Sequence, residues 1–439
     1  MDTKKTVYIA ISADIIHSGH INIIREGAKY GDVIIGLLTD EAIASYKRPP
    51  LLDYDQRKAL LESVRYVSKI VKQDTLSYAH NLHELKPDYV LHGDDWKSGI
   101  QSEVRVEVLE ILNEYGGKLI EIPYTVGVSG QELDKKLQPV LNTPDIRRAK
   151  LRHLLRLKPY VRVIEASNGL SGLIVENAKY EDPKTMKVKE YDAMWVSSLC
   201  DSSFKGKPDI ELVDLTSRIN TINEIMEVTT KPIILDGDTG GKIEHFVYNV
   251  RTLERLGISA IIIEDKTGLK QNSLFGTDAV QTLEDVDAFC DKIRSGKQAQ
   301  VTRDFMIIAR LESLIAGAGL EDALMRAKKY IEAGADGLMI HSKEKDGSEI
   351  IEFLRRLREF APAIPVVLVP TTYNQFTEDE LHAFGADIII HANHLLRSAY
   401  PAMLHTAQKI LECGRSKEVD SEIMSIKEVL ALIPEAKQS

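Results

Sequence analysis

Long apolar runs are absent from this 439-residue sequence, and none approaches the roughly 18 consecutive residues that a membrane span needs. The first residues, MDTKKTVYIAISAD, do not have the pattern of a signal peptide. Cysteine is scarce: Cys200, Cys290 and Cys413 lie far apart without metal-ligand spacing, as in a reduced protein. An excess of basic residues is also lacking, and the net charge of −10 argues against a nucleic-acid or membrane partner. We therefore expect a cytoplasmic protein that acts on small molecules.

Two successive α/β patterns divide the chain, whose length suits two or three domains. The first contains five β-branched runs that alternate with helix-like segments, at 6–12, 32–39, 69–73, 89–93 and 118–123. This alternation predicts a parallel sheet covered on both faces, in a Rossmann-like, doubly wound unit. Gly and Pro residues then interrupt the pattern near Asn142–Pro144, which predicts domains at 1–140 and 141–439.

The second pattern contains eight strand-like runs, and each of the first seven is followed by a candidate helix. The runs lie at 162–167, 193–198, 232–238, 260–265, 305–312, 337–343, 365–372 and 387–394. Eight buried strands joined by right-handed helical crossovers predict a (β/α)₈ barrel of the TIM type. A helical C-terminal tail is expected at roughly 398–434.

Polar side chains stand at the ends of nearly all eight runs. They are Glu165, Ser197, Asp236, Asp238, Glu264, Asp265, Arg310, Glu312, His341 and Asn393. Strand ends that simply reach solvent would explain some of these charges. They do not easily explain acids on the third and fourth strands with Arg and His on the fifth and sixth. Because active sites of such barrels lie at the carboxyl ends of the strands, we expect the site there.

The carboxylates Asp236, Asp238 and Glu264 come from adjacent strand ends in this prediction. Three carboxylates so close repel one another unless a cation lies between them. Oxygen ligands without His or Cys suit Mg²⁺ or Mn²⁺, held partly through water. The polar loop 264–276 that follows is either an ordinary surface loop or a lid over an anionic substrate.

Dispersed motifs follow one another in the second half of the chain. They are GLSGLIVENA (169–178), MWVSSL (194–199), LDGDTGG (235–241), EDK (264–266), KQNS (270–273), ARLESLIAG (309–317), MIHSK (339–343) and ANHLLR (392–397). In this order they resemble phosphoenolpyruvate mutase of the isocitrate lyase superfamily, from about 150 to 434. The resemblance implies a Mg²⁺-dependent isomerase that converts phosphoenolpyruvate to phosphonopyruvate.

The same resemblance implies roles for individual residues. The metal and its waters would be held by Asp236, Asp238 and Glu264. The pyruvyl carboxylate would be bound by Ser197, Ser198 and Leu199. Substrate oxygens and the reacting centre would be contacted by Arg310, His341 and Asp209. The closing lid would contribute Lys270, Asn272 and Ser273.

Two positions depart from the family pattern: Ser198 replaces a usual Gly, and Leu269 replaces a usual Pro in the lid. Asn272 favours a mutase over the related phosphonopyruvate hydrolases, which differ at this lid position. The hydrolase remains the alternative for the barrel.

An HSGH motif, His17 to His20, stands where the first strand meets the first helix. It suits triphosphate binding at a helix amino terminus. With DYDQRKALLESVRYV (53–67), GDDW (93–96) and YTVGVS (124–129), it resembles the cytidylyltransferases of glycerol-3-phosphate and ethanolamine-phosphate. The resemblance implies that CTP phosphates contact a set of five residues: His17, His20, Lys47, Arg65 and Asp94. Trp96 fits either a place near the base or a core aromatic.

The cytidylyltransferase pattern is incomplete, because Tyr124 stands where an Arg is usual and Gly130-Gln131 where hydroxyl residues are usual. Two interpretations therefore stay open. In one, the chain is a bifunctional enzyme of phosphonate biosynthesis that also transfers CMP to a phosphonate such as 2-aminoethylphosphonate. In the other, residues 1–140 are a non-catalytic nucleotide-binding module. Because related barrels exchange terminal helices between subunits, the resemblance implies that the helical tail helps to assemble a homo-oligomer, a dimer or a tetramer.

Overall fold

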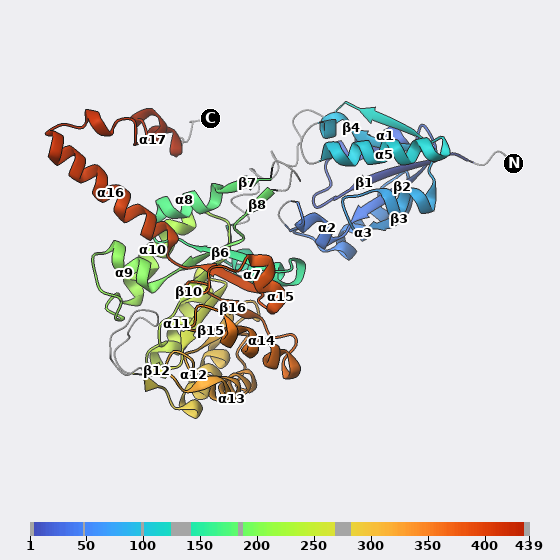
Figure 1. Ribbon diagram of the computed structural model, residues 1–439. Helices are drawn as coiled ribbons and strands as arrows, with labels where there is room; N and C mark the ends of the chain where they lie inside the picture. Colours follow the sequence, from blue (N-terminus) through green and yellow to red (C-terminus); the bar gives the residue numbers. More distant parts are fainter. Residues whose placement is uncertain are drawn as a thin grey trace.

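The computed structural model describes residues 4–46, 49–97, 101–123, 142–182, 188–267 and 282–433. Two separate sheets organise them, an open five-stranded sheet and a closed eight-stranded barrel (Figure 1). The predicted fold class, a Rossmann-like unit followed by a TIM-type barrel with a helical tail, is confirmed. The predicted domain boundary between residues 140 and 141 lies outside the described residues.

The open sheet has five parallel strands in the order β3-β2-β1-β4-β5. They are β1 (Thr6–Ile11), β2 (Asp32–Leu38), β3 (Val67–Gln73), β4 (Tyr89–Gly93) and β5 (Lys118–Ile122). The helices between them are α1 (Ser18–Gly27), α2 (Asp40–Ala44), α3 (Tyr54–Glu62), α4 (Ala79–Leu85), the 3₁₀ turn η1 (Asp94–Lys97) and α5 (Gln101–Tyr115). Two apolar clusters lie on opposite faces of this sheet, because successive side chains of a strand point to opposite faces. The strand order reverses between β1 and β4, where such folds bind their ligands.

The barrel strands are all parallel and follow the chain order around the ring. They are β6 (Val161–Glu165), β9 (Ala193–Val196), β10 (Ile233–Asp236), β11 (Ala260–Glu264), β14 (Met306–Leu311), β15 (Gly337–Ile340), β16 (Val366–Leu368) and β17 (Ile388–His391). The last strand, β17, pairs with β6 and closes the ring. Two short antiparallel strand pairs are separate from the barrel sheet. They are β7 (Lys179–Glu181) with β8 (Val188–Glu190), and β12 (Lys266–Thr267) with β13 (Thr282–Leu283).

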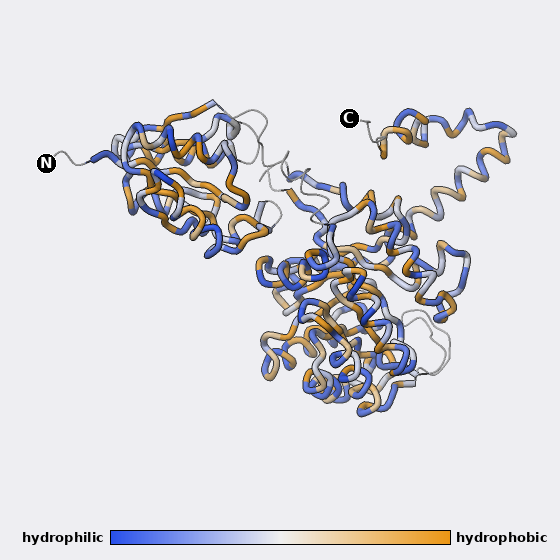
Figure 2. Tube along the Cα trace, turned by 180° about the vertical axis from the view of Figure 1, so that it is seen from behind, coloured by the Kyte–Doolittle hydropathy of each residue, from blue (hydrophilic) through white to orange (hydrophobic). Residues whose placement is uncertain are grey.

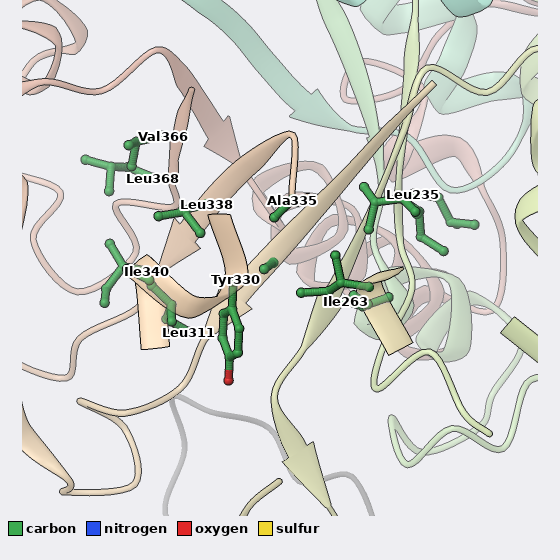
Figure 3. Packing of buried hydrophobic residues seen from close by; sticks show 14 of the residues in the cluster. Leu235, Ile263, Leu311, Tyr330, Ala335, Leu338, Ile340, Val366 and Leu368 are labelled. Carbon is green, nitrogen blue, oxygen red and sulfur yellow. The ribbon is translucent and has the colours of Figure 1, made fainter. Parts of the chain in front are cut away.

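The outer helices cover the barrel through amphipathic faces. They are α8 (Gly169–Asn177), α9 (Ser198–Phe204), α10 (Leu215–Val228), α11 (Ile243–Leu256), α12 (Val286–Ala299), α13 (Gly319–Glu332), α14 (Ser348–Phe360) and α15 (Glu378–Phe384). Figure 3 shows part of the resulting packing, in which Tyr330 of α13 lies near Leu311 and Leu338 of the barrel wall. The alternate strand residues fill the barrel interior as a second cluster.

Helix α7 (Pro144–Leu157) closes the amino-terminal end of the barrel. Leu151 and Leu154 join the interior cluster. The polar side chains of α7 bond groups that immediately precede barrel strands: Lys150 Nζ donates to Thr230 O at 2.8 Å, and Arg152 pairs with Asp336 at 2.6 Å. The chain therefore enters the barrel at the end opposite the carboxyl ends of the strands.

The C-terminal tail consists of α16 (His394–Cys413), the 3₁₀ turn η2 (Lys417–Val419) and α17 (Ile426–Leu432). No residue of α16 is buried, and the helix extends away from the barrel (Figure 1). Figure 2 shows hydrophobic stretches in α17, on a part of the chain that stands clear of the barrel. Within the described ranges, no helix is both long and apolar enough to cross a membrane.

Candidate active site

A cavity opens at the carboxyl-terminal ends of the barrel strands. It is lined by Trp195, Ser197, Ser198, Leu199, Asp209, Asp236, Arg310, Met339, His341, Val369, Thr371, Ala392 and Asn393. The strands deliver these groups together because all eight run in parallel and end at the same rim. Acidic, basic and hydroxyl groups thus meet in one hollow.

Asp236 is one of two carboxylates, with Asp209, among the described residues that line this cavity. One of its oxygens, Oδ2, accepts hydrogen bonds from the Ser198 backbone N at 3.1 Å and from Ser198 Oγ at 2.8 Å. Ser198 is the residue that departs from the expected Gly, and its hydroxyl is directed to Asp236. The two bonds orient a carboxylate that is 6% exposed.

Asp238 lies two residues beyond the end of β10, in the left-handed backbone region with φ of 53°. Its Oδ2 lies 3.2 Å from Nη1 of Arg218, a buried arginine on α10. Its backbone carbonyl accepts from Glu264 N at 2.8 Å, which joins the ends of β10 and β11. A side chain in this region costs roughly 1–2 kcal/mol, so surrounding contacts must stabilise it.

Glu264 belongs to a buried network of two acids and two bases. Arg310 Nη1 lies 3.2 Å from Glu264 Oε2, and Arg310 Nε donates to Glu312 Oε1 at 2.5 Å. Lys266 Nζ lies 3.4 Å from Glu264 and 3.6 Å from Glu312. Burial lowers the pKa of Arg310, but the charges of Glu312 and Glu264 raise this pKa by more than burial lowers it. The guanidinium therefore stays charged.

His341 follows β15 directly and is 7% exposed, and neither of its ring nitrogens has a hydrogen-bond partner among the residues that the structure describes. Burial, followed by the charge of Arg310, lowers the pKa of His341 to about 3. The imidazole is therefore neutral at physiological pH. A buried polar ring without partners, directed into a cavity, points to a ligand that completes its hydrogen bonds.

The carboxylates could hold a cation through a mixed shell of protein oxygens and water. Among the described residues, no three Asp, Glu, His or Cys side chains converge closely enough to bind one ion directly. Asp236 faces the cavity, while Asp238 and Glu264 are paired with Arg218 and Arg310. This donor set fits Mg²⁺, which keeps several waters and binds through one or two carboxylates plus the substrate.

Most of the predicted barrel residues meet at this site. Those lining the cavity are Ser197, Ser198, Leu199, Asp209, Asp236, Arg310 and His341. Asp238 and Glu264 are buried next to them. The predicted lid residues Lys270, Asn272 and Ser273 lie outside the described residues.

Sequence reasoning missed several residues of the site. The barrel interior contributes Trp195 and Met339, whose inward direction follows from strand alternation. Thr371 was visible only as the polar end of the seventh run. Arg218 gave no signal, because it lies on a helix rather than at a strand end.

In the open sheet, His17 and His20 form the amino terminus of α1, which follows β1. Each caps the other's backbone: Gly19 N donates to His17 Nδ1 at 3.1 Å, and His17 N donates to His20 Nδ1 at 3.4 Å. Their rings lie 3.9 Å apart between centroids. Asp94 follows β4, the strand next to β1, so it lies at the same edge of the sheet.

Arg65 does not join this edge within one chain, which corrects the expectation that it contacts the nucleotide there. It immediately precedes β3 and so lies at the amino-terminal edge of the parallel sheet, while the His pair follows the carboxyl end of β1. Arg57 of α3 is fully buried, and its Nη1 donates to Ser12 O, just beyond β1, at 2.5 Å. Lys47 lies outside the described residues.

Trp96 is a core aromatic. It is 1% exposed, its ring stacks on His92 at 3.8 Å, and its Nε1 donates to Glu121 at 2.9 Å. Of the two interpretations of this residue, the structure supports the core one.

Two family models match the chain. Residues 151–411 match the one described as phosphoenolpyruvate phosphomutase, and residues 12–172 match the one described as cytidylyltransferase-like. The two matches overlap in α7, β6 and the start of α8, which are barrel elements in the structure. Both resemblances inferred from the motifs are thereby confirmed at the level of family.

Individual relatives are similar to the barrel. The phosphoenolpyruvate phosphomutase of Tetrahymena pyriformis is 35% identical over 284 residues, which cover 64% of this chain and 90% of that protein. The phosphonopyruvate hydrolase of Variovorax sp. (strain Pal2) is 35% identical over 267 residues, covering 60% and 91%. Sequence identity therefore does not separate mutase from hydrolase.

Solved structures give the same pair of similarities. The crystal structure of phosphoenolpyruvate phosphomutase from Streptomyces platensis subsp. rosaceus has a TM-score of 0.59 at 35% identity, covering 65% of this chain and 94% of that one. A phosphonopyruvate hydrolase in complex with oxalate and Mg²⁺ has a TM-score of 0.58 at 32% identity, with the same coverage.

Proposed function

This chain belongs to the phosphoenolpyruvate phosphomutase family, and on that basis we propose that its barrel interconverts phosphoenolpyruvate and 3-phosphonopyruvate. The observation that carries the proposal is the meeting of Asp236, Arg310 and neutral His341 in one cavity. Phosphoryl transfer passes through a loose transition state, so positioning and charge stabilisation supply most of the catalysis. The cavity offers both.

Magnesium is the proposed cofactor, with Mn²⁺ as a substitute; Asp236, Asp238 and Glu264 would hold it together with water. When bound, the ion supplies Lewis-acid stabilisation of the negative charge on the enolate oxygen. The hydrolase complex with oxalate and Mg²⁺ supports this assignment, because oxalate is a small dicarboxylate and is negatively charged like the proposed substrate.

The chain's own residues bind and orient the substrate. Arg310, with its planar fork of donors, binds carboxylate or phosphoryl oxygens, and His341 offers one neutral N–H donor. Ser197, Ser198 and Leu199 bind the pyruvyl carboxylate, and Asp209 lies beside the migrating phosphoryl group. The lid residues Lys270, Asn272 and Ser273 exclude water, which would otherwise capture the phosphoryl group.

The alternative for the barrel is a phosphonopyruvate hydrolase. Phosphonopyruvate incubated with the protein and Mg²⁺ and followed by ³¹P NMR separates the two. We expect a phosphoenolpyruvate signal. Inorganic phosphate as the sole product would identify a hydrolase, and neither product would refute both assignments. An Arg310→Lys variant, which keeps the charge but loses the fork, controls for contaminating activity.

For the amino-terminal domain we propose CMP transfer from CTP to a phosphonate such as 2-aminoethylphosphonate. The cytidylyltransferase-like match and the mutual caps of His17 and His20 at the sheet's switch point support this. Pyrophosphate release that requires both substrates and disappears in His17→Ala is the expected result. CTP binding without release, unchanged in His17→Ala, would instead identify a non-catalytic module.

The two activities together would make a bifunctional enzyme of phosphonate biosynthesis. We further propose that the chain assembles as a homo-oligomer through its exposed tail, and that it is cytoplasmic. Its small-molecule partners are phosphoenolpyruvate, phosphonopyruvate and CTP.

A further inference from the structure

Arg218 is a buried arginine that no motif singled out and that lies behind the acidic end of β10. It projects from the first turn of α10, is 4% exposed, and donates to three acceptors. Its Nη1 donates to Asp236 O at 2.5 Å and to Asp238 Oδ2 at 3.2 Å, and its Nη2 donates to Val196 O at 3.1 Å. One guanidinium therefore joins the last residues of β9 and β10 to the carboxylate of Asp238.

The backbone at this point needs such support. Asp238 adopts a left-handed conformation, which is unfavourable for a residue with a side chain, and its carbonyl is committed to Glu264 N. The carbonyls of Val196 and Asp236 stand where the barrel strands end. Arg218 satisfies both carbonyls and fixes the Asp238 side chain in the same step.

Arg218 is itself held in place by an acidic residue of α9. Its Nε lies 3.7 Å from Oδ2 of Asp201, which is fully buried on α9. Thr221 Oγ1 donates to Asp201 Oδ1 at 2.8 Å, and Lys205 pairs with the same oxygen. Arg218 is therefore held between one acid on the helix side and one acid at the strand end.

We propose that Arg218 is a positioning residue that sets the geometry of the Asp236–Asp238 pair for the cation. The inference rests on the proposed Mg²⁺ site and concerns how this chain builds it. Two effects of Arg218 oppose each other: its charge reduces the attraction of the acids for a cation, while its fork orients them. The structure favours orientation, because three acceptors in different directions match a planar fork and not a single ammonium group.

The test measures Mn²⁺ binding to the full-length protein by electron paramagnetic resonance, without substrate. If Arg218 positions the pair, Arg218→Lys and Arg218→Gln both weaken Mn²⁺ affinity, by about 10–100-fold, as removal of an outer-shell partner does elsewhere. Activity at saturating metal should recover much more than activity at limiting metal. If charge alone acts, Arg218→Gln binds Mn²⁺ more tightly and Arg218→Lys is unchanged, and the proposal is wrong.

A matched control separates positioning from general loosening of the barrel. Arg147 is equally buried and donates to two backbone carbonyls, Thr229 O at 2.7 Å and Met226 O at 3.2 Å, at the opposite end of the barrel. Arg147→Lys should lower the melting temperature and leave Mn²⁺ affinity unchanged. Equal weakening in Arg147→Lys would overturn the proposal.

Two further variants keep the outcomes distinct. Asp201→Asn removes the acid behind Arg218 without touching the cavity, and it should weaken Mn²⁺ binding several-fold even if the Arg218 variants do not fold. Asp236→Asn locates the binding at this site. Failure of the wild-type protein to bind Mn²⁺ would contradict the proposed metal site itself, whereas unchanged affinity in Asp201→Asn and Arg218→Lys would contradict only the role of Arg218.

Discussion

Arg310 lies between Glu264 and Glu312, and all three side chains are more than nine-tenths buried. Lys266 adds a second positive charge to the same network. Because two acids and two bases balance there, removal of one base leaves a buried negative charge without compensation. The residue that we propose to bind substrate is thus also a stabilising residue.

We predict that Arg310→Met lowers the free energy of unfolding by about 3–5 kcal/mol, in addition to abolishing activity. Urea unfolding measures this change. The control is Arg355→Met, because Arg355 forms an exposed pair with Glu352 on α14 and its loss should lower the free energy of unfolding far less. Similar losses in the two variants would contradict the argument that burial sets the cost.

Single residues of the barrel site could be predicted where a regular pattern exposes them. Asp236, Arg310 and His341 stand at the carboxyl ends of parallel strands. Because these ends lie at one rim of the barrel, the strand pattern predicts that the three side chains come together. Arg218 could not be found in this way, because its contacts depend on how α10 packs against the strand ends. Pairing of buried charges is a property of the packed barrel and not of local sequence.

At the scale of elements, α15 fastens the seam where the first and last barrel strands meet. Glu378, in the first turn of α15, accepts from Arg162 Nε of β6 at 2.7 Å. It also lies 3.1 Å from Nε2 of His391, which ends β17. One carboxylate therefore connects a helix with both strands of the closing pair.

This seam predicts a pH dependence of stability. Burial alone raises the pKa of Glu378, but hydrogen bonds from His391 and Arg162 outweigh it and lower the pKa to about 2. A carboxyl with a lowered pKa stabilises the fold above its ordinary pKa near 4.5, and this stabilisation is lost as the pH falls towards 2.

Glu378→Gln should therefore cost about 2–3 kcal/mol at pH 7, and the difference from wild type should shrink as the pH falls below 5. The sequence contains two tryptophans, Trp96 in the open-sheet domain and Trp195 in the barrel. In a protein in which Trp96 is replaced by Phe, urea unfolding followed by Trp195 fluorescence therefore reports on the barrel alone. A difference that stays constant with pH would assign the effect to packing rather than to ionisation.

The elements themselves were largely predictable, and their limits less so. Each of the five strands of the open sheet and the eight strands of the barrel begins within two residues of the first residue of its predicted run. The tail helix was expected from residue 398 but begins at His394. The reason lies far away in sequence: Glu165 Oε1 accepts from Leu395 N at 2.5 Å and from Leu396 N at 3.1 Å, and so caps the helix.

At the scale of the whole molecule, the tail leaves apolar side chains uncovered. Tyr400 and Leu411 of α16 are 69% and 83% exposed, and Leu430 of α17 is 74% exposed. Contiguous apolar surface of this kind marks contacts with another molecule. A second copy of the chain supplies a matching surface by symmetry.

We predict that the double substitution Leu411→Glu with Leu430→Glu reduces the proposed homo-oligomer to a monomer. Light scattering coupled to size-exclusion chromatography measures the mass. Val301→Glu is the matched control, because Val301 is 86% exposed on the barrel and not on the tail. The tail would be excluded as the interface if the double variant kept the mass of the wild type.

A second prediction at this scale concerns the independence of the two sites. His17 lies in the open sheet, whereas Arg310 lies in the barrel, and the first described helix after residue 141 meets the barrel at the end remote from its cavity. His17→Ala should therefore abolish pyrophosphate release and leave turnover of phosphonopyruvate within twofold of wild type. Arg310→Lys should do the reverse. A parallel loss of both activities in either variant would indicate coupling.

Because α7 closes the amino-terminal end of the barrel, it also bears on what the joining of the two domains in one chain can contribute to metabolism. A product of the proposed reaction would leave the barrel at the rim opposite α7, so we expect it to enter the bulk solution. Covalent attachment would then fix the two proposed active sites in equal number, while transfer between them would be left to diffusion. A competing enzyme added in excess should accordingly intercept the phosphonopyruvate completely.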